Sequence, residues 1–129
     1  MSASFLTSLD VRIMDDCGPR PKIMLLEPLH YQSDIVGTVI VPRFTISDGS
    51  SVPTPAMGIF GWPAVRAGVV HDWLIDMQVE RRTAAKVFLE ALAVCGIDEG
   101  TAEALYQGVR IYDRYVEQQN QPPEEPVGA

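Results

Sequence analysis

The chain has 129 residues, of which 47% are hydrophobic and 21% charged, so it has enough apolar material for one hydrophobic core and little for a second. Its 17 acidic and 10 basic side chains give a net charge of -7, and because such a surface repels phosphate backbones, we expect no nucleic-acid partner. The sequence has neither an apolar run long enough for a membrane span nor a signal-peptide pattern at its start, so we expect synthesis in the cytoplasm.

The N-terminal half predicts short β-strands separated by turn residues. Extended apolar runs occupy residues 9–14 (LDVRIM), 22–27 (KIMLLE) and 35–41 (IVGTVIV). The DDCGPRP segment separates the first two runs, and we expect the stretch from Pro28 to Asp34 to interrupt the later ones. These features predict a small antiparallel sheet made of hairpins or a meander.

The C-terminal half predicts three helices, because apolar residues recur there every three or four positions. The first helix is expected to bury Ala67, Val70, Leu74 and Met77. The second is expected to end at Gly96 and to bury Ala84, Phe88, Ala91, Leu92 and Cys95. The third is expected to begin after an Asp98 cap, with an apolar seam of Ala102, Leu105, Val109, Tyr112 and Val116.

This seam could form an intermolecular coiled coil, but it is short, and packing on the chain's own core is favoured. Residues 1–117 are therefore expected to form a single α+β domain, with the helices packed on the sheet. Residues 118–129 are rich in Pro and Glu and lack the apolar groups that would offset ordering entropy, so we expect a flexible tail. A partner protein could bind this tail as an extended strand through Pro122, Pro123 and Pro126, although an ordinary frayed terminus has the same composition.

The segment between the predicted sheet and helices carries the most distinctive motifs. In chain order they are Val41-Pro42, the DGSSVP run at residues 48–53, His71-Asp72-Trp73-Leu74, and Arg81 ahead of Val87-Phe88. With these blocks the chain, over about residues 5–115, resembles the phage- and prophage-associated domain-of-unknown-function 1353 family. The resemblance implies a phage context, a DGxSxP loop and an HDxL helix, but no particular activity.

Two positions depart from the family's usual pattern. An acidic residue is usual in the helix after the arginine, as in R-x-x-A-D-x-x-F, but Ala85 stands at that place. The segment from Phe44 to Asp48 is also one residue longer than the common pattern. Both departures weaken the case for catalysis.

Three residues that match the family's motifs suggest a metal-dependent hydrolase: Asp48, His71 and Asp72. One histidine and two carboxylates can hold a divalent cation that activates water. His71 and Asp72 are adjacent on the predicted helix and project about 100° apart, so both reach one ligand only if the helix edge faces it. Asp76 could replace the carboxylate missing at Ala85, although the resemblance does not support it. A serine nucleophile at Ser50 or Ser51 is disfavoured, since neither GxSxG nor a spaced base and orienting acid is present.

The same region could instead act as a structural lock between loop and helix. Asp48, Ser50 and Ser51 are residue types that hydrogen-bond nearby backbone and stabilise a loop. In this interpretation a buried His71 bonds the loop backbone, and Asp72 pairs with Arg81 or Arg82. Because of Ala85 we favour the structural role over a catalytic one, and we expect neither a cofactor nor a firmly bound metal.

The favoured function is a phage virion-associated structural or assembly protein that acts through protein–protein contacts. The phage context comes from the resemblance alone. Its partners would be other virion proteins, and a homo-oligomer within the particle is compatible with this function. The chain would be made in the host cytoplasm and then become part of the virion. The alternative is a metal-dependent hydrolase, active or degenerate, centred on Asp48, His71 and Asp72. The sequence leaves open whether the chain is an enzyme, and it favours a role without catalysis.

Overall fold

The computed structural model describes residues 2–14, 22–47 and 62–120, and within them it shows an α+β fold. Strands lie in the N-terminal half and helices in the C-terminal half, which confirms the predicted fold class. Two predicted segments lie outside the described residues: the loop with Asp48, Ser50 and Ser51, and the tail with Pro122, Pro123 and Pro126.

The described strands form two three-stranded antiparallel sheets rather than the one sheet expected. The first has the order β1-β4-β5 and contains β1 (Ser4–Phe5), β4 (Leu29–Ser33) and β5 (Gly37–Val41). The second has the order β2-β3-β6 and contains β2 (Val11–Met14), β3 (Lys22–Leu25) and β6 (Ile46–Ser47). Strands β1 and β6 have two residues each, too few for an alternating pattern to be visible in the sequence.

The stretch from Pro28 to Asp34, which was predicted to break up the later extended runs, itself contains strand β4 (Leu29–Ser33), so that prediction was wrong. Leu29, Tyr31 and Ser33 are buried and alternate with half-buried residues, as expected for a strand with one face on the core. Pro28 precedes the strand, where its missing N–H breaks no bond of the ladder. The hairpin then enters β5 at Gly37, whose φ of 81° is in the left-handed region.

The described helices agree with the three that were predicted: α2 (Trp62–Asp76), α3 (Arg81–Val94) and α4 (Glu99–Gln119). Helix α3 stops just before Gly96, whose φ of 86° ends the helical path. The Asp98 carboxylate accepts a hydrogen bond from the Thr101 N–H at 3.0 Å and caps α4 as expected. Helix α4 runs to Gln119, so the first residues assigned to the tail are helical. No helix within the described segments combines the length and the apolar character needed to cross a bilayer.

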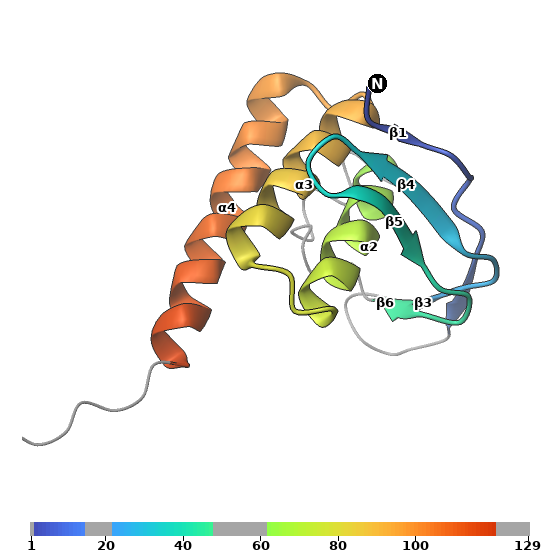
Figure 1. Cartoon of the computed structure of the whole chain (residues 1–129), viewed down its shortest axis with the longest axis horizontal. Helices are drawn as coiled ribbons and strands as arrows, with labels where there is room; N and C mark the ends of the chain where they lie inside the picture. Colours follow the sequence, from blue (N-terminus) through green and yellow to red (C-terminus); the bar gives the residue numbers. More distant parts are fainter. Residues whose placement is uncertain (1, 15–21, 48–61, 121–129) are drawn as a thin grey trace, which may run out of the picture.

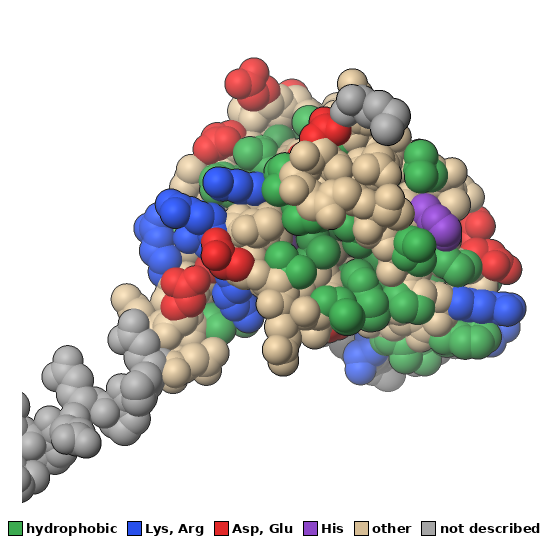
Figure 2. Space-filling view, viewed as in Figure 1, with side chains coloured by type: hydrophobic (Ala, Val, Ile, Leu, Met, Phe, Trp, Pro, Cys, Tyr) green, Lys and Arg blue, Asp and Glu red, His purple; other side chains and the backbone are tan. Residues whose placement is uncertain are grey.

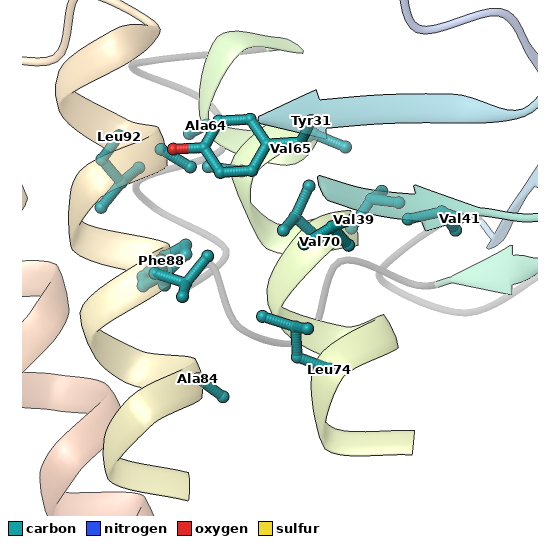
Figure 3. Packing of buried hydrophobic residues seen from close by; sticks show 14 of the residues in the cluster. Tyr31, Val39, Val41, Ala64, Val65, Val70, Leu74, Ala84, Phe88 and Leu92 are labelled. Carbon is teal, nitrogen blue, oxygen red and sulfur yellow. The ribbon is translucent and has the colours of Figure 1, made fainter. Parts of the chain in front are cut away.

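The core lies between the β1-β4-β5 sheet and the helices α2 and α3, and α4 packs on α3 at the outer side (Figure 1). Figure 3 shows Tyr31, Val39 and Val41 of the sheet close to Val70 of α2, with Phe88 of α3 nearby. The Tyr31 hydroxyl donates a hydrogen bond to Glu90 Oε1 at 2.6 Å, which ties the sheet to α3. The helices therefore take part in one hydrophobic core with the sheet.

Four residues expected in the buried stripes are partly or largely exposed: Met77, Cys95, Tyr112 and Val116. Met77 follows the last residue of α2, and Cys95 is the half-buried C-cap of α3. On α4, Ala102, Leu105 and Val109 are buried as predicted, but Asp113 is buried where the predicted seam continues with Tyr112. The first half of the seam thus packs on the chain's own core, and the second half does not.

Candidate functional site

A groove of about 720 Å³ lies between α2, α4 and the β2-β3-β6 sheet. Helix α2 contributes His71, Asp72, Ile75 and Asp76, and the sheet contributes Lys22, Ile46 and Ser47. Arg81 lies at the start of α3, and α4 contributes Ala104, Leu105, Gly108, Val109 and Tyr112. Polar and charged groups from α2, β3, β6 and α3 therefore face an apolar wall formed by α4.

Asp72 connects α2 to β6 through a hydrogen bond to Ser47. The Ser47 hydroxyl, buried at the edge of the sheet, donates to Asp72 Oδ2 at 2.8 Å. The two residues are far apart in sequence, so this contact fixes the position of the helix relative to the sheet. A structural lock between loop and helix predicts hydrogen bonds of this kind, but Ser47 was not among the residues predicted to form them.

His71 lies next to Asp72 on α2 but is much more deeply buried. Its ring lies beside the Phe88 ring at a tilt of 44°, with 5.3 Å between ring centres, and Nδ1 lies 3.9 Å from Asp72 Oδ1. The pKa of His71 is lowered from 6.5 to about 4, mainly by burial; the nearby Asp113 carboxylate opposes this shift, and the positive charge of Arg81 adds to it. His71 is therefore neutral at pH 7, and its contact with Asp72 is not an ion pair there.

Asp113, a fully buried charged group that pairs with the groove residue Arg81, was missed by the sequence analysis. Its carboxylate is fully buried, with Arg81 Nη1 3.2 Å from Oδ1 and Arg110 Nη1 3.0 Å from Oδ2. The ion pair between Arg81 and Asp113 joins α3 to α4, so Arg81 has a partner other than the Asp72 proposed for it. The spacing of Asp113, four residues after the buried Val109, was the signal in the sequence that could have located it.

Ala85 is fully buried between the helices, as expected of a core alanine. The acidic residue that the resemblance implies at this position would add a carboxylate to the interior of the fold, where the described residues place the carboxylate of Asp113 on α4. The described residues contain no cluster of three or more His, Cys, Asp or Glu side chains suited to a metal ion. His71 and Asp72 are the two members of the predicted hydrolase site that fall within the description, and Asp48 and Ser51 fall outside it.

The arrangement can bind polar groups more readily than it can perform nucleophilic catalysis. Ser47, the described serine at the groove, donates its hydroxyl to Asp72, whereas a nucleophilic serine would donate to a histidine base. His71 is neutral and could accept a proton, but it is 5% exposed. A ligand in the groove can therefore reach a carboxylate, an arginine and a tyrosine, whereas the histidine lies buried below the surface.

Comparison with known proteins gives one family and no characterised relative. The model of a family described as a protein of unknown function (DUF1353) matches residues 23–109, which is more than half of the chain. The matched region runs from β3 into the middle of α4 and contains the whole of the described groove except Tyr112 and Lys22. Neither a curated protein nor a solved structure matches the chain.

Proposed function

Since this chain belongs to the DUF1353 family, whose description assigns no activity, we propose from its own surface that it is a structural or assembly protein of a phage particle that acts by binding other proteins. The observation that carries the proposal is an exposed apolar face on the second half of α4. The phage context rests on the resemblance of the HDWL and DGSSVP motifs described above.

The α4 face consists of Ile111, Tyr112 and Tyr115, whose side chains are 65%, 61% and 58% exposed. The rings of the two tyrosines lie 6.5 Å apart and form one continuous patch. Single exposed apolar residues are common on protein surfaces, but a contiguous patch on one helix face is typical of an interaction site. Tyrosine is also among the residues that contribute most to binding at protein interfaces.

The charge of the molecule favours a protein partner over a nucleic acid. The net charge is -7, so the average surface repels a phosphate backbone. Basic side chains gather on the side of the molecule that α4 forms (Figure 2), but there they alternate with acidic and apolar ones. A mixed apolar and charged surface of this kind is typical of protein–protein interfaces.

The experiment is to measure the copy number of the chain in purified particles of the phage that encodes it, by quantitative mass spectrometry. We expect a stoichiometric copy number for the parent protein and at least a roughly tenfold loss for Tyr112→Glu/Tyr115→Glu, because charged side chains cannot be buried in the interface. Ile40→Glu, at an exposed position on β5, is the matched control and should enter particles normally. Particles that lack the parent chain would overturn the proposal.

The Pro-rich tail has a separate test, because Pro122, Pro123 and Pro126 lie outside the described residues. Deletion of residues 121–129 removes these prolines and leaves α4 complete. If the tail binds a particle protein, the shortened chain keeps its melting temperature but is lost from particles. Normal incorporation of the shortened chain would assign the binding to the folded domain alone.

A metal-dependent hydrolase centred on Asp48, His71 and Asp72 is the second candidate function. It is favoured by the groove, where a neutral histidine lies beside a carboxylate, an arrangement that can serve as a general base. Titration calorimetry with Zn²⁺ and Mn²⁺ tests it, with His71→Asn as the variant and His30→Asn as the control. One equivalent of metal that binds the parent and the control but not His71→Asn would favour the hydrolase.

A further inference from the structure

The outer face of the β2-β3-β6 sheet combines positive charge with apolar side chains. Residues directly opposite each other on neighbouring strands point to the same side of a sheet. By this rule one side carries two cations and three apolar residues: Arg12, Met14, Lys22, Met24 and Ile46. The other side carries Ile23, Leu25 and Ser47, which are all buried, so the first side is the outer one.

Cations and methionines alternate on this outer face. Each of β2 and β3 has one cation and one methionine two residues apart, and the register places Arg12 opposite Met24 and Lys22 opposite Met14. Positions two residues apart on a strand are about 7 Å apart, and every extended chain has the same spacing along each of its sides. An extended segment with acidic and apolar residues at every second position therefore matches the outer face.

The charge of this region is opposite to that of the whole chain. The chain has 17 acidic and 10 basic side chains, but no acidic residue occurs in β2, β3, β6 or residues 42–45. A short acidic segment would meet only this local positive charge. A long polyanion such as nucleic acid would also meet the negative remainder of the molecule, so the charge pattern favours an acidic protein segment.

Phe44, two residues before β6, is 59% exposed and has a φ of 71°, in the left-handed region. Its N–H donates to the Leu25 carbonyl at 2.8 Å, and the Leu25 N–H donates to the Thr45 carbonyl at 2.9 Å. Two residues thus oppose one residue of β3, which is the pattern of a β-bulge whose first residue is normally glycine. A phenylalanine there has a steric cost and gains little burial in its own chain, so its ring is suited to contact a partner.

Arg43 adds a second exposed arginine at this end of the sheet. Its guanidinium lies 4.8 Å from the centre of the Phe44 ring, in a cation–π contact. Because the bulge is hydrogen-bonded to Leu25, the pair lies next to Met24 at the end of the outer face. A carboxylate bound by Arg43 and an apolar group packed on Phe44 could therefore belong to one partner segment.

We propose that the outer face, together with Arg43 and Phe44, binds an extended acidic segment of a partner protein. Arg12 and Arg43 bind carboxylates of the segment, and Phe44, Ile46 and the methionines contact its apolar side chains. This surface shares no residue with the α4 face, and its binding is measured on the purified chain. It therefore stands or falls independently of the proposed function.

Fluorescence anisotropy of the full chain with a labelled peptide of Glu-Ser-Leu-Ser repeats tests the proposal. We expect binding that weakens with added salt and a dissociation constant that rises at least roughly tenfold in Arg12→Glu and in Arg43→Glu. Arg82→Glu makes the same charge change at an exposed position on α3 and should bind as the parent does. A peptide of Glu-Leu-Ser-Ser repeats has the same composition but puts Glu and Leu on opposite sides of an extended chain, so it should bind at least roughly tenfold more weakly.

Phe44→Gly gives a second arm in which folding is not at risk. Glycine adopts the left-handed conformation without a steric cost, so we expect an unchanged or higher melting temperature together with at least a roughly tenfold loss of affinity for the first peptide. A parent protein that does not bind this peptide, or a Phe44→Gly variant that binds it equally well, would overturn the proposal. Tighter binding of single-stranded DNA than of the peptide would also overturn it, because an exposed aromatic ring beside arginines would then serve a nucleic acid.

Discussion

The guanidinium of Arg81, at the first residue of α3, lies 3.2 Å from the carboxylate of Asp113, which is fully buried on α4. Arg110 approaches the second carboxylate oxygen at 3.0 Å. Asp113→Asn keeps the size of the side chain but leaves both arginines without their negative partner. We expect it to lower the free energy of unfolding by about 2–3 kcal/mol, less than for a fully enclosed pair because Arg81 is partly exposed.

Denaturant unfolding measures this change, and Arg82→Gln is the control. Arg82 is the exposed neighbour of Arg81 on the same helix, so its replacement should change stability by less than about 0.5 kcal/mol. If Asp113→Asn is as stable as the parent protein, the buried ion pair does not hold α4 on α3.

Asp113 also illustrates how far the sequence could predict the helices. Helical spacing located α2, α3 and α4 and the buried residues Leu105 and Val109, because apolar periodicity is a local property. The same spacing places position 113 on the buried face, but an aspartate there contradicts the rule that buried positions are apolar. Its arginine partner on α3 is 32 residues away, and nothing local in the sequence reveals that contact.

Only part of the candidate site could be predicted from the sequence, because its contacts also join residues that are far apart in the chain. His71 and Asp72 do line one groove, as their position on the helix allowed, but Ser47, the hydrogen-bond partner of Asp72, is 25 residues distant and lies on a strand of two residues. The sequence contains no periodic signal for such a strand. Strand β4 was missed because its polar residues and Pro28 resemble a turn, although every second residue is buried.

Tyr31→Phe should destabilise the protein by about 1–2 kcal/mol. The Tyr31 ring is fully buried, and its hydroxyl donates to Glu90, which also accepts from the Asp34 N–H. Removing the hydroxyl takes one donor from this carboxylate without removing the ring from the core. Thermal unfolding gives the value, and Tyr115→Phe, at an exposed position on α4, is the matched control. Equal melting temperatures for Tyr31→Phe and the parent would show that the Glu90 contact does not tie the sheet to α3.

Removal of metal should leave the stability of the protein unchanged. Ala85 supplies no carboxylate to the helices, and the described residues contain no group of metal ligands, so we expect elemental analysis to find well under one equivalent of zinc, manganese or iron. Melting curves with and without EDTA should coincide, because a ligand bound only to the folded state would raise the melting temperature. One firmly held equivalent, with a lower melting temperature in EDTA, would contradict this expectation and favour the hydrolase.

The free energy of unfolding should decrease as the pH is lowered, because of His71. Burial lowers the pKa of this side chain from 6.5 to about 4 in the folded state, so between these values the unfolded chain binds a proton that the folded chain does not. The contribution of neutral His71 to the free energy of unfolding is therefore fully present above about pH 6.5. It is lost progressively as the pH falls towards about 4, by at most about 3 kcal/mol.

Carboxylates add their own pH dependence, so the measurement is a comparison of variants rather than a single curve. The free energy of unfolding is measured from pH 7.5 down to the lowest pH at which the fold persists, for the parent, for His71→Gln and for His30→Gln. His71→Gln lacks the buried imidazole, and its curve should be flatter between about pH 6.5 and pH 4 even if the substitution lowers stability at every pH. His30→Gln removes the other histidine of the chain and is the control for the loss of a histidine as such. Parallel curves for His71→Gln and the parent would mean that His71 takes up its proton equally well in the folded and unfolded states, contrary to its burial against Phe88.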